Sequence, residues 1–230
     1  MYDAINRGLR RASGDILAHL NCDEQYLPGA LGVVHDYFEK HRDVEMLFAE
    51  GIIVDVNGDY MAHRHVCVPT LYHTMVGPGL LVLTCATFFR RSVIDKHKVF
   101  FDPKFKNIGD AEWMARVIAA GVRFGHMKAF TSVYTYTGNN LSLSSAAPRE
   151  RRDMAASAPW WLRHARPLLT LQYQFRRLVA GHFRQLPAFD YAIYTMKSPG
   201  ARLVKRAERP TFRWPAVMLT GVKDMPAEAR

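Results

Sequence analysis

Long apolar segments are missing from this 230-residue sequence, and cysteine is scarce. No apolar run reaches the roughly 18 residues of a membrane-spanning helix, because the longest, residues 77–86, is too short and contains a proline. The first residues lack the basic and then apolar order of a signal peptide. The three cysteines, Cys22, Cys67 and Cys85, are odd in number and have no metal-ligand spacing. These absences predict a reduced, cytoplasmic setting.

Internal repeats, nucleic-acid-binding motifs and histidine pairs with metal-ligand spacing are also missing. The ten histidines include His63 and His65, and a chance pair is the more frequent explanation of two histidines spaced in this way. Without a recognisable motif, basic charge alone does not indicate a nucleic-acid partner. We therefore expect no binding of nucleic acid.

The net charge of +10 is confined to the last third of the chain. Residues 1–148 contain 15 basic residues (Lys and Arg) and 15 acidic residues (Asp and Glu). Residues 149–230 contain 16 basic and 6 acidic residues. A charge split of this kind predicts a neutral catalytic body, residues 1–145, followed by a basic tail, residues 146–230.

Alternating helical and strand-like patterns predict the α/β class for the body. Strands are expected over residues 15–20, 44–54, 80–90 and 130–137, and helices over residues 2–13 and 111–120 and from Pro28 and Ser92. We expect the strand at 15–20 to be central, because both of its faces look apolar. The basic tail is expected to be helical and then irregular over its last thirty residues, which contain three prolines.

Two acidic clusters carry candidate chemistry. Asn21, Asp23 and Glu24 follow the predicted strand at 15–20, and a carboxylate at a strand end can hold a divalent cation that bridges the phosphates of a nucleotide. Asp110 opens a predicted helix, where it can cap the helix or take a proton from a hydroxyl group. Taken alone, an acidic turn and a helix cap are the more frequent explanations of these clusters.

Five motifs, in order and at the correct spacing, together resemble inverting, metal-dependent glycosyltransferases of family 2, which have the GT-A fold. They are the stretch Tyr2–Gly8, Ala12–Ile16 and Leu20–Tyr26, then Thr87–Arg91, Phe101–Asp102, Gly109–Trp113 and Gly138–Ser142. The resemblance covers residues 1–145. It implies a partial GT-A, Rossmann-like sheet with flanking helices, followed by the helical basic tail.

The resemblance also assigns roles by position. Asp110 matches the catalytic base, and Asp23 matches the aspartate that binds Mg²⁺ or Mn²⁺. In such enzymes the base deprotonates the acceptor hydroxyl while the sugar leaves its nucleoside diphosphate, and the anomeric centre inverts. The matches on the donor side are Asp3, Asn6, Asn21 and Asp23, and those on the acceptor side are Glu50 and Glu112.

The implied partners are a nucleotide-sugar donor and a glycan or lipid-linked acceptor, in polysaccharide biosynthesis. The resemblance starts at the third helix of the family, so the opening half, which holds much of the nucleotide, is expected upstream or in a partner, if it exists. Glu24 replaces a frequent Asp, and Glu50 stands where many relatives have a Gly-Asp pair. An inactive remnant and a basic module that binds a membrane surface are the alternative functions.

The basic tail leaves two alternatives open. Trp160 and Trp161 lie near arginines, and Leu168 and Phe175 share one face of a predicted helix. Residues 149–186 either lie on the cytoplasmic face of the membrane, which gives peripheral localisation, or pack against the body with their arginines solvated. Burial or exposure of the two tryptophans distinguishes these alternatives.

Overall fold

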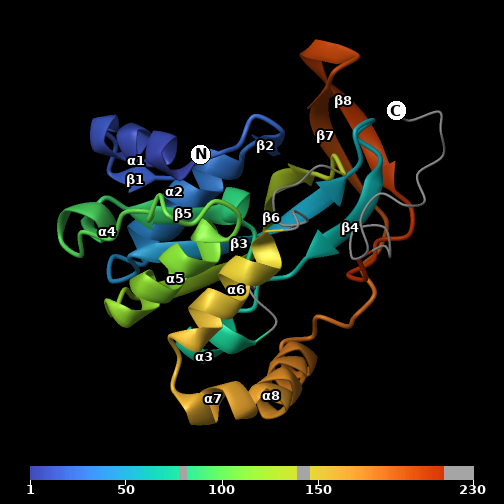
Figure 1. The fold of residues 1–230 in the computed structure, drawn as a ribbon. Coiled ribbons are helices and arrows are strands. Elements are labelled where there is room, and N and C mark those ends of the chain that lie inside the picture. Colours follow the sequence, from blue (N-terminus) through green and yellow to red (C-terminus); the bar gives the residue numbers. More distant parts are fainter. Residues whose placement is uncertain (78–81, 139–145, 215–230) are drawn as a thin grey trace.

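A curved sheet with helices on both faces forms the body of the molecule (Figure 1). The computed structural model describes residues 1–77, 82–138 and 146–214. The strands of the sheet are β1 (Ile16–Leu17), β2 (Glu24–Tyr26), β3 (Met46–Val54), β4 (Tyr60–Arg64), β5 (Thr87–Arg90) and β6 (Phe124–Thr135). The helices are α1 (Tyr2–Arg11), α2 (Ala30–Lys40), α3 (Leu71–Val76), α4 (Ser92–Asp95), α5 (Gly109–Ala119), α6 (Ala147–Ala156), α7 (Trp160–His164) and α8 (Arg166–Val179). The expected α/β class is confirmed.

β3 lies at the centre of the sheet, and all nine of its residues are buried. The strand order is β1-β5-β3-β6-β2, with β4 also paired to β3, and β3–β6 is the single parallel pair among the described strands. Because successive side chains point to opposite faces, Met46 and Phe48 pack with α1 and α5, whereas Leu47 and Ala49 pack with α2. The β3–β6 register shifts on both sides of Glu50.

The strand expected at residues 15–20 is shorter than predicted, and the prediction that it is central was wrong. β1 has two residues and, within the described part of the chain, pairs only with β5 at the end of the sheet. Leu17 is buried, but Leu20 is exposed. Beyond Leu17 the chain leaves the sheet, and the ring of His19 packs edge-on against Phe101, with 5.6 Å between the ring centroids. The apolar run therefore reflects loop packing as well as a strand.

The C-terminal part of the chain is helical only at first. After α8 come β7 (Phe189–Thr195) and β8 (Ser198–Ala207), an antiparallel hairpin that the sequence analysis did not predict. Its inward side chains, Tyr191 and Ile193, are buried against Ile52, Val54 and Val133 of the sheet. The expected boundary at residue 145, most of the motif Gly138–Ser142 and most of the last thirty residues lie outside the described residues.

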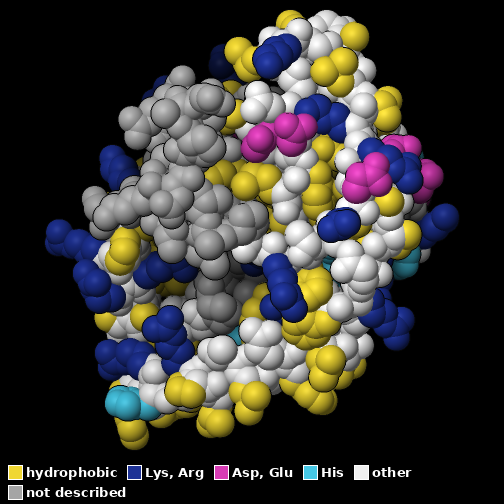
Figure 2. Space-filling model, turned by 90° about the vertical axis from the view of Figure 1, so that its right-hand side faces the viewer, with side chains coloured by type: hydrophobic (Ala, Val, Ile, Leu, Met, Phe, Trp, Pro, Cys, Tyr) yellow, Lys and Arg dark blue, Asp and Glu magenta, His cyan; other side chains and the backbone are white. Residues whose placement is uncertain are grey.

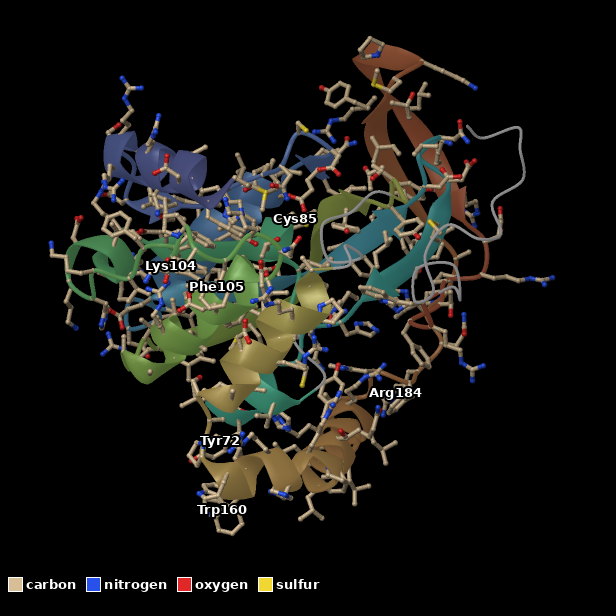
Figure 3. All side chains as sticks on the ribbon, viewed as in Figure 1. Tyr72, Cys85, Lys104, Phe105, Trp160 and Arg184 are labelled. Carbon is tan, nitrogen blue, oxygen red and sulfur yellow. The ribbon has the colours of Figure 1, made fainter. Side chains whose placement is uncertain are left out.

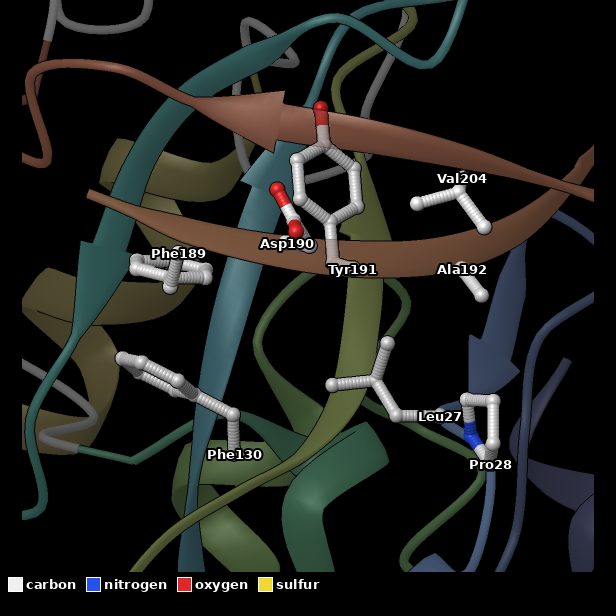
Figure 4. A pocket seen from close by; sticks show the side chains of 8 residues that line it. All are labelled: Leu27, Pro28, Phe130, Phe189, Asp190, Tyr191, Ala192 and Val204. Carbon is white, nitrogen blue, oxygen red and sulfur yellow. The ribbon is translucent and has the colours of Figure 1, made fainter.

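A cavity of about 360 Å³ lies where the hairpin meets the sheet (Figure 4). Leu27 and Pro28 line one side and Ala192 and Val204 the other, so the lining is largely apolar. None of the helices described here is long and apolar enough to cross a membrane.

Candidate functional site

The first acidic cluster lies in the turn between β1 and β2, rather than directly at the end of a long strand. The backbone N–H of Asn21 donates to Glu24 Oε2 at 2.8 Å, which closes the turn around Asp23. Asp23 is half-buried, and the described residues offer it no hydrogen bond or ion pair. Its carboxylate is therefore free to take a ligand.

Glu24 is the buried carboxyl group of this cluster. Glu24 opens β2 opposite Tyr134 of β6, and only 8% of its surface is exposed. Burial raises the pKa of Glu24 to about 7, the hydrogen bonds from Asn21 oppose this rise, and the charge of Asp23 adds to it. Glu24 Oε1 has no hydrogen-bond partner of normal geometry in the described structure, although the thiol of Cys85 lies beside the carboxyl group. Figure 3 labels Cys85.

The second cluster is at the start of α5, where Asp110 stands in the first turn. Asp110 Oδ1 accepts the backbone N–H of Ala111 at 2.8 Å, and the backbone N–H of Asp110 donates to the Tyr2 hydroxyl at 3.2 Å. Burial raises the pKa of Asp110, and the hydrogen bond from Ala111 and the charge of Arg151 counteract part of that rise. A carboxylate with a raised pKa is a better proton acceptor near neutral pH.

Tyr134 of β6 connects the two clusters. Burial is the largest cause that raises the pKa of its hydroxyl, and the nearby negative charges of Glu24, Asp23 and Asp110 raise it further. Only charges that lie close to the hydroxyl act in this way. Asp23, Glu24 and Asp110 therefore each lie near enough to Tyr134 for their charges to act on its hydroxyl.

A column of aromatic rings holds the start of α5 in place. Tyr2 stacks on Phe101, with 5.3 Å between ring centroids, and Phe101 stacks on Trp113, with 4.4 Å. A Cβ at Gly109 would lie 2.5 Å from the Tyr2 ring, so the column requires glycine at this position. Sequence analysis placed Tyr2 in a helix motif but did not predict its contact with Asp110.

Glu150 of α6 is a second residue that sequence analysis missed. Its carboxylate accepts the backbone N–H groups of Lys106, Asn107 and Ile108 at 2.9–3.0 Å, in the turn that leads into α5. Burial favours a higher pKa for Glu150, but these hydrogen bonds outweigh burial and lower it. No motif could have indicated this contact, because Glu150 lies about forty residues further along the chain.

Three other predicted residues have partners within the protein. Both polar atoms of the Asn6 amide bond the backbone of Phe101, at 2.8 and 2.9 Å, so Asn6 ties α1 to the loop before α5. Asp3 is exposed and pairs with Arg7, and Glu112 pairs with Arg116. Donor binding by Asp3 and Asn6 and an acceptor-side role for Glu112 stay predictions.

Glu50 lines a second cavity of about 360 Å³, whose lining includes neither aspartate. Its Oε1 is 2.8 Å from Nδ1 of His65, and Nε2 of His65 is 3.2 Å from Nε2 of His63. The cavity is also lined by Lys128 and His182. His63 and His65 therefore form a hydrogen-bonded pair, and the acceptor-side role of Glu50 stays a prediction.

A divalent cation fits the first cluster, although the protein alone does not enclose one. Among the residues that the structure describes, no group of three or more His, Cys, Asp and Glu side chains could hold a metal ion. Mg²⁺ and Mn²⁺ typically take one or two carboxylates together with substrate phosphates. Asp23 would supply one such carboxylate, and Glu24, whose buried Oε1 lacks a hydrogen bond of normal geometry in the described structure, stands next to it in the same turn.

Comparison with known proteins places the site in context. Residues 1–98 match the family model described as Glycosyl transferase family 2. A crystal structure of S. aureus TarS 1–349 in complex with UDP-GlcNAc is similar with a TM-score of 0.48 and 15% identity, over 65% of this chain and 43% of that chain. The complex of TarS 1–349 with UDP gives 0.46 and 13%, over 76% and 50%. No curated protein matches.

The chain spans half or less of the length of these TarS structures. The family match covers α1 to α4, and with them the turn that carries Asp23 and Glu24. Residues 1–98 are thus similar to glycosyl transferase family 2.

Proposed function

We propose that this chain is the acceptor-side part of a GT-A glycosyltransferase, which transfers a sugar from a nucleotide-sugar donor to a glycan or lipid-linked acceptor with inversion. The observation that carries the proposal is the family 2 match over the first 98 residues, which includes the turn with Asp23 and Glu24. The charge of Asp110, at the start of α5, acts on the same tyrosine, Tyr134, as the charges of these two residues. Asp23 and Glu24 would act on the donor diphosphate through a divalent cation, and Asp110 would act on the acceptor hydroxyl.

Each residue has a distinct task in the proposed reaction. Asp110 accepts the proton of the acceptor hydroxyl as that oxygen bonds to the anomeric carbon. The bond between the anomeric carbon and the nucleoside diphosphate breaks on the opposite side, and its electron pair leaves with the diphosphate. Asp23, with Glu24 beside it, would hold a divalent cation, which would offset charge on the leaving diphosphate. Asn21 keeps Glu24 in place through its backbone N–H.

Asp110→Asn tests the base. The amide oxygen can still accept the N–H of Ala111, so α5 keeps its cap while the proton acceptor is lost. In the full-length protein we expect turnover to fall by about two to four orders of magnitude, measured as nucleoside diphosphate released from a panel of nucleotide-sugars. Asp153→Asn, an exposed carboxylate on α6, is the control. Activity within a few-fold of the parent would leave Asp110 as a helix cap only.

Asp23→Ala and metal removal test the donor side. We expect chelation to abolish transfer, Mn²⁺ to restore it in the parent, and the Asp23→Ala protein to stay inactive at every Mn²⁺ concentration. An unchanged response of Asp23→Ala to Mn²⁺ would refute the assignment. A full-length protein that binds a nucleotide-sugar but releases no diphosphate with any donor or acceptor would favour the inactive remnant.

A further inference from the structure

α7 and α8 lie at one end of the molecule (Figure 1). They carry a row of exposed apolar side chains. Trp160 is 69% exposed, Leu168 69% and Val179 72%. Trp160 projects from the tip of this end in Figure 3, and apolar side chains gather along the lower edge of the molecule in Figure 2. We call this row the outer face, and it consists of Trp160, Trp161, Leu168, Leu171, Phe175, Leu178 and Val179.

The outer face is not needed to hold the helices in place. Residues spaced by three, four or seven positions share one side of a helix, and the outer face of α8 follows this spacing. The opposite side of these helices supplies Leu162 and Leu169, which are buried with Val76 of α3 and Ala158. The packing of the tail against the body, one of the two alternatives, is therefore provided by Leu162 and Leu169 and not by the outer face. An exposed apolar row of this size usually marks a binding surface.

The arginines of this segment divide into two groups. Arg176 donates to the carbonyl of Val68, and the guanidinium of Arg177 stacks over the ring of Phe183, so both have partners within the protein. The others are exposed and make no ion pair within the described structure: Arg163, Arg166 and Arg184.

The segment also lacks negative charge. Residues 154–189 contain no Asp or Glu, but they contain five arginines and two histidines. A partner for the outer face therefore needs an apolar layer bordered by negative charge.

We propose that the outer face docks on the surface of an anionic lipid bilayer. Tryptophan is enriched at the level of lipid headgroups, aliphatic side chains enter the acyl boundary, and arginines on the border attract acidic headgroups. A second copy of this chain fits the face less well. In a two-fold interface the same acid-free surface meets itself, and arginine would lie opposite arginine.

Vesicle co-sedimentation of the intact chain tests the proposal without reference to catalysis. We expect binding to mixed phosphatidylcholine and phosphatidylglycerol vesicles at low salt, much less binding at high salt, and none to phosphatidylcholine alone. The paired substitution Leu171→Ser with Phe175→Ser should weaken binding by about tenfold or more without changing the melting temperature, because both side chains are exposed.

Two further variants separate the apolar and the electrostatic contributions. Arg163→Gln with Arg166→Gln should weaken binding and flatten its dependence on salt. Val204→Ser removes an equally exposed apolar side chain on β8 and should bind like the parent.

Failure of the parent to bind anionic vesicles at low salt would overturn the proposal, as would full binding by the paired serine variant. Analytical ultracentrifugation tests whether a second copy of the chain binds the outer face. A dimer that the paired serine variant disperses would assign the outer face to a second copy and also overturn membrane docking.

Discussion

Glu24 is a buried carboxyl group whose pKa, about 7, lies well above the ordinary value of 4.5. Between these two values the folded chain keeps the proton that the unfolded chain has lost. Unfolding therefore releases a proton, and the free energy of unfolding falls as pH rises from about 4.5 to 7. The loss is on the order of 3 kcal/mol at most and levels off above pH 7.

Glu24→Gln removes this ionisation with little change of shape. We expect the variant to match the parent in thermal melts at pH 5 and to melt several degrees higher at pH 8, because glutamine carries no buried charge. Asp36→Asn, an exposed carboxylate on α2, is the matched control. Equal melting temperatures for Glu24→Gln and the parent at pH 8 would show that ionisation of Glu24 does not lower the stability of the folded protein.

The sequence predicted the two aspartates of the site better than their surroundings. Asp23 and Asp110 were predicted from motifs, and their roles stay predictions, although the charges of both act on the Tyr134 hydroxyl. The burial of Glu24 could not be predicted, because it depends on β6, more than a hundred residues away in the chain. Nor did any pattern connect Tyr2 with Gly109, a contact that exists only after two helices have packed.

At the scale of elements, the start of α5 depends on a contact from α6. The first N–H groups of a helix have no hydrogen-bond partner within the helix. The N–H groups just before α5 likewise need partners from elsewhere in the chain. Glu150 satisfies three of them and also accepts from the side-chain amide of Asn107 at 2.8 Å. The carboxylate thus holds the turn from which Asp110 projects.

Glu150→Gln is expected to destabilise the protein. One carboxylate oxygen becomes an NH₂ group that faces N–H donors, so about 1–3 kcal/mol and several degrees of melting temperature should be lost. In the parent this contribution is present above pH 4.5 and is lost as pH falls below it, because folding lowers the pKa of Glu150. Asp153→Asn on the same helix should have no such effect, and thermal melts of both variants decide the point.

Elements with a clear period were predicted from the sequence, and those that depend on distant contacts were not. The helices at α1, α2 and α5 follow apolar spacing that the core uses directly. The β7–β8 hairpin was missed although buried Tyr191 and Ile193 alternate with less buried neighbours, because the basic charge and the prolines indicated an irregular tail. The length of β1 was overestimated, because an apolar run does not show whether strands or loops cover its side chains.

At the scale of the molecule, the hairpin joins the last part of the chain to the body. Ile193 lies over Gly58, where an added Cβ would come within 2.5 Å of Ile193 Cδ1, and the Tyr191 hydroxyl donates to the Gly58 carbonyl at 2.9 Å. Lys205 Nζ bonds Asn57 O and Asp59 in the same turn. The turn between β3 and β4 is therefore enclosed by residues that follow it by more than 130 positions.

Ile193→Ala tests whether the body and the hairpin unfold together. The cavity left by the shorter side chain should reduce the free energy of unfolding by about 2–5 kcal/mol. The whole chain should still melt in a single transition, at a lower temperature. Hydrogen exchange of β3 should accelerate with it, since β3 packs on the hairpin. Val204→Ala, on the exposed side of β8, should leave both unchanged. Two separate transitions, with β3 unaffected, would instead show an independent tail.

The parallel pairing of β3 with β6 has a consequence for synthesis. The register joins Met46 to Phe124, so β3 leaves the ribosome long before its partner exists. At about 5–20 residues per second, the delay is several seconds. β4 and β5 emerge earlier, but throughout that interval the edge of β3 that pairs with β6 lacks its partner and is open to other chains. The nascent protein is therefore expected to need a chaperone at this stage, and slower translation beyond β3 should increase aggregation.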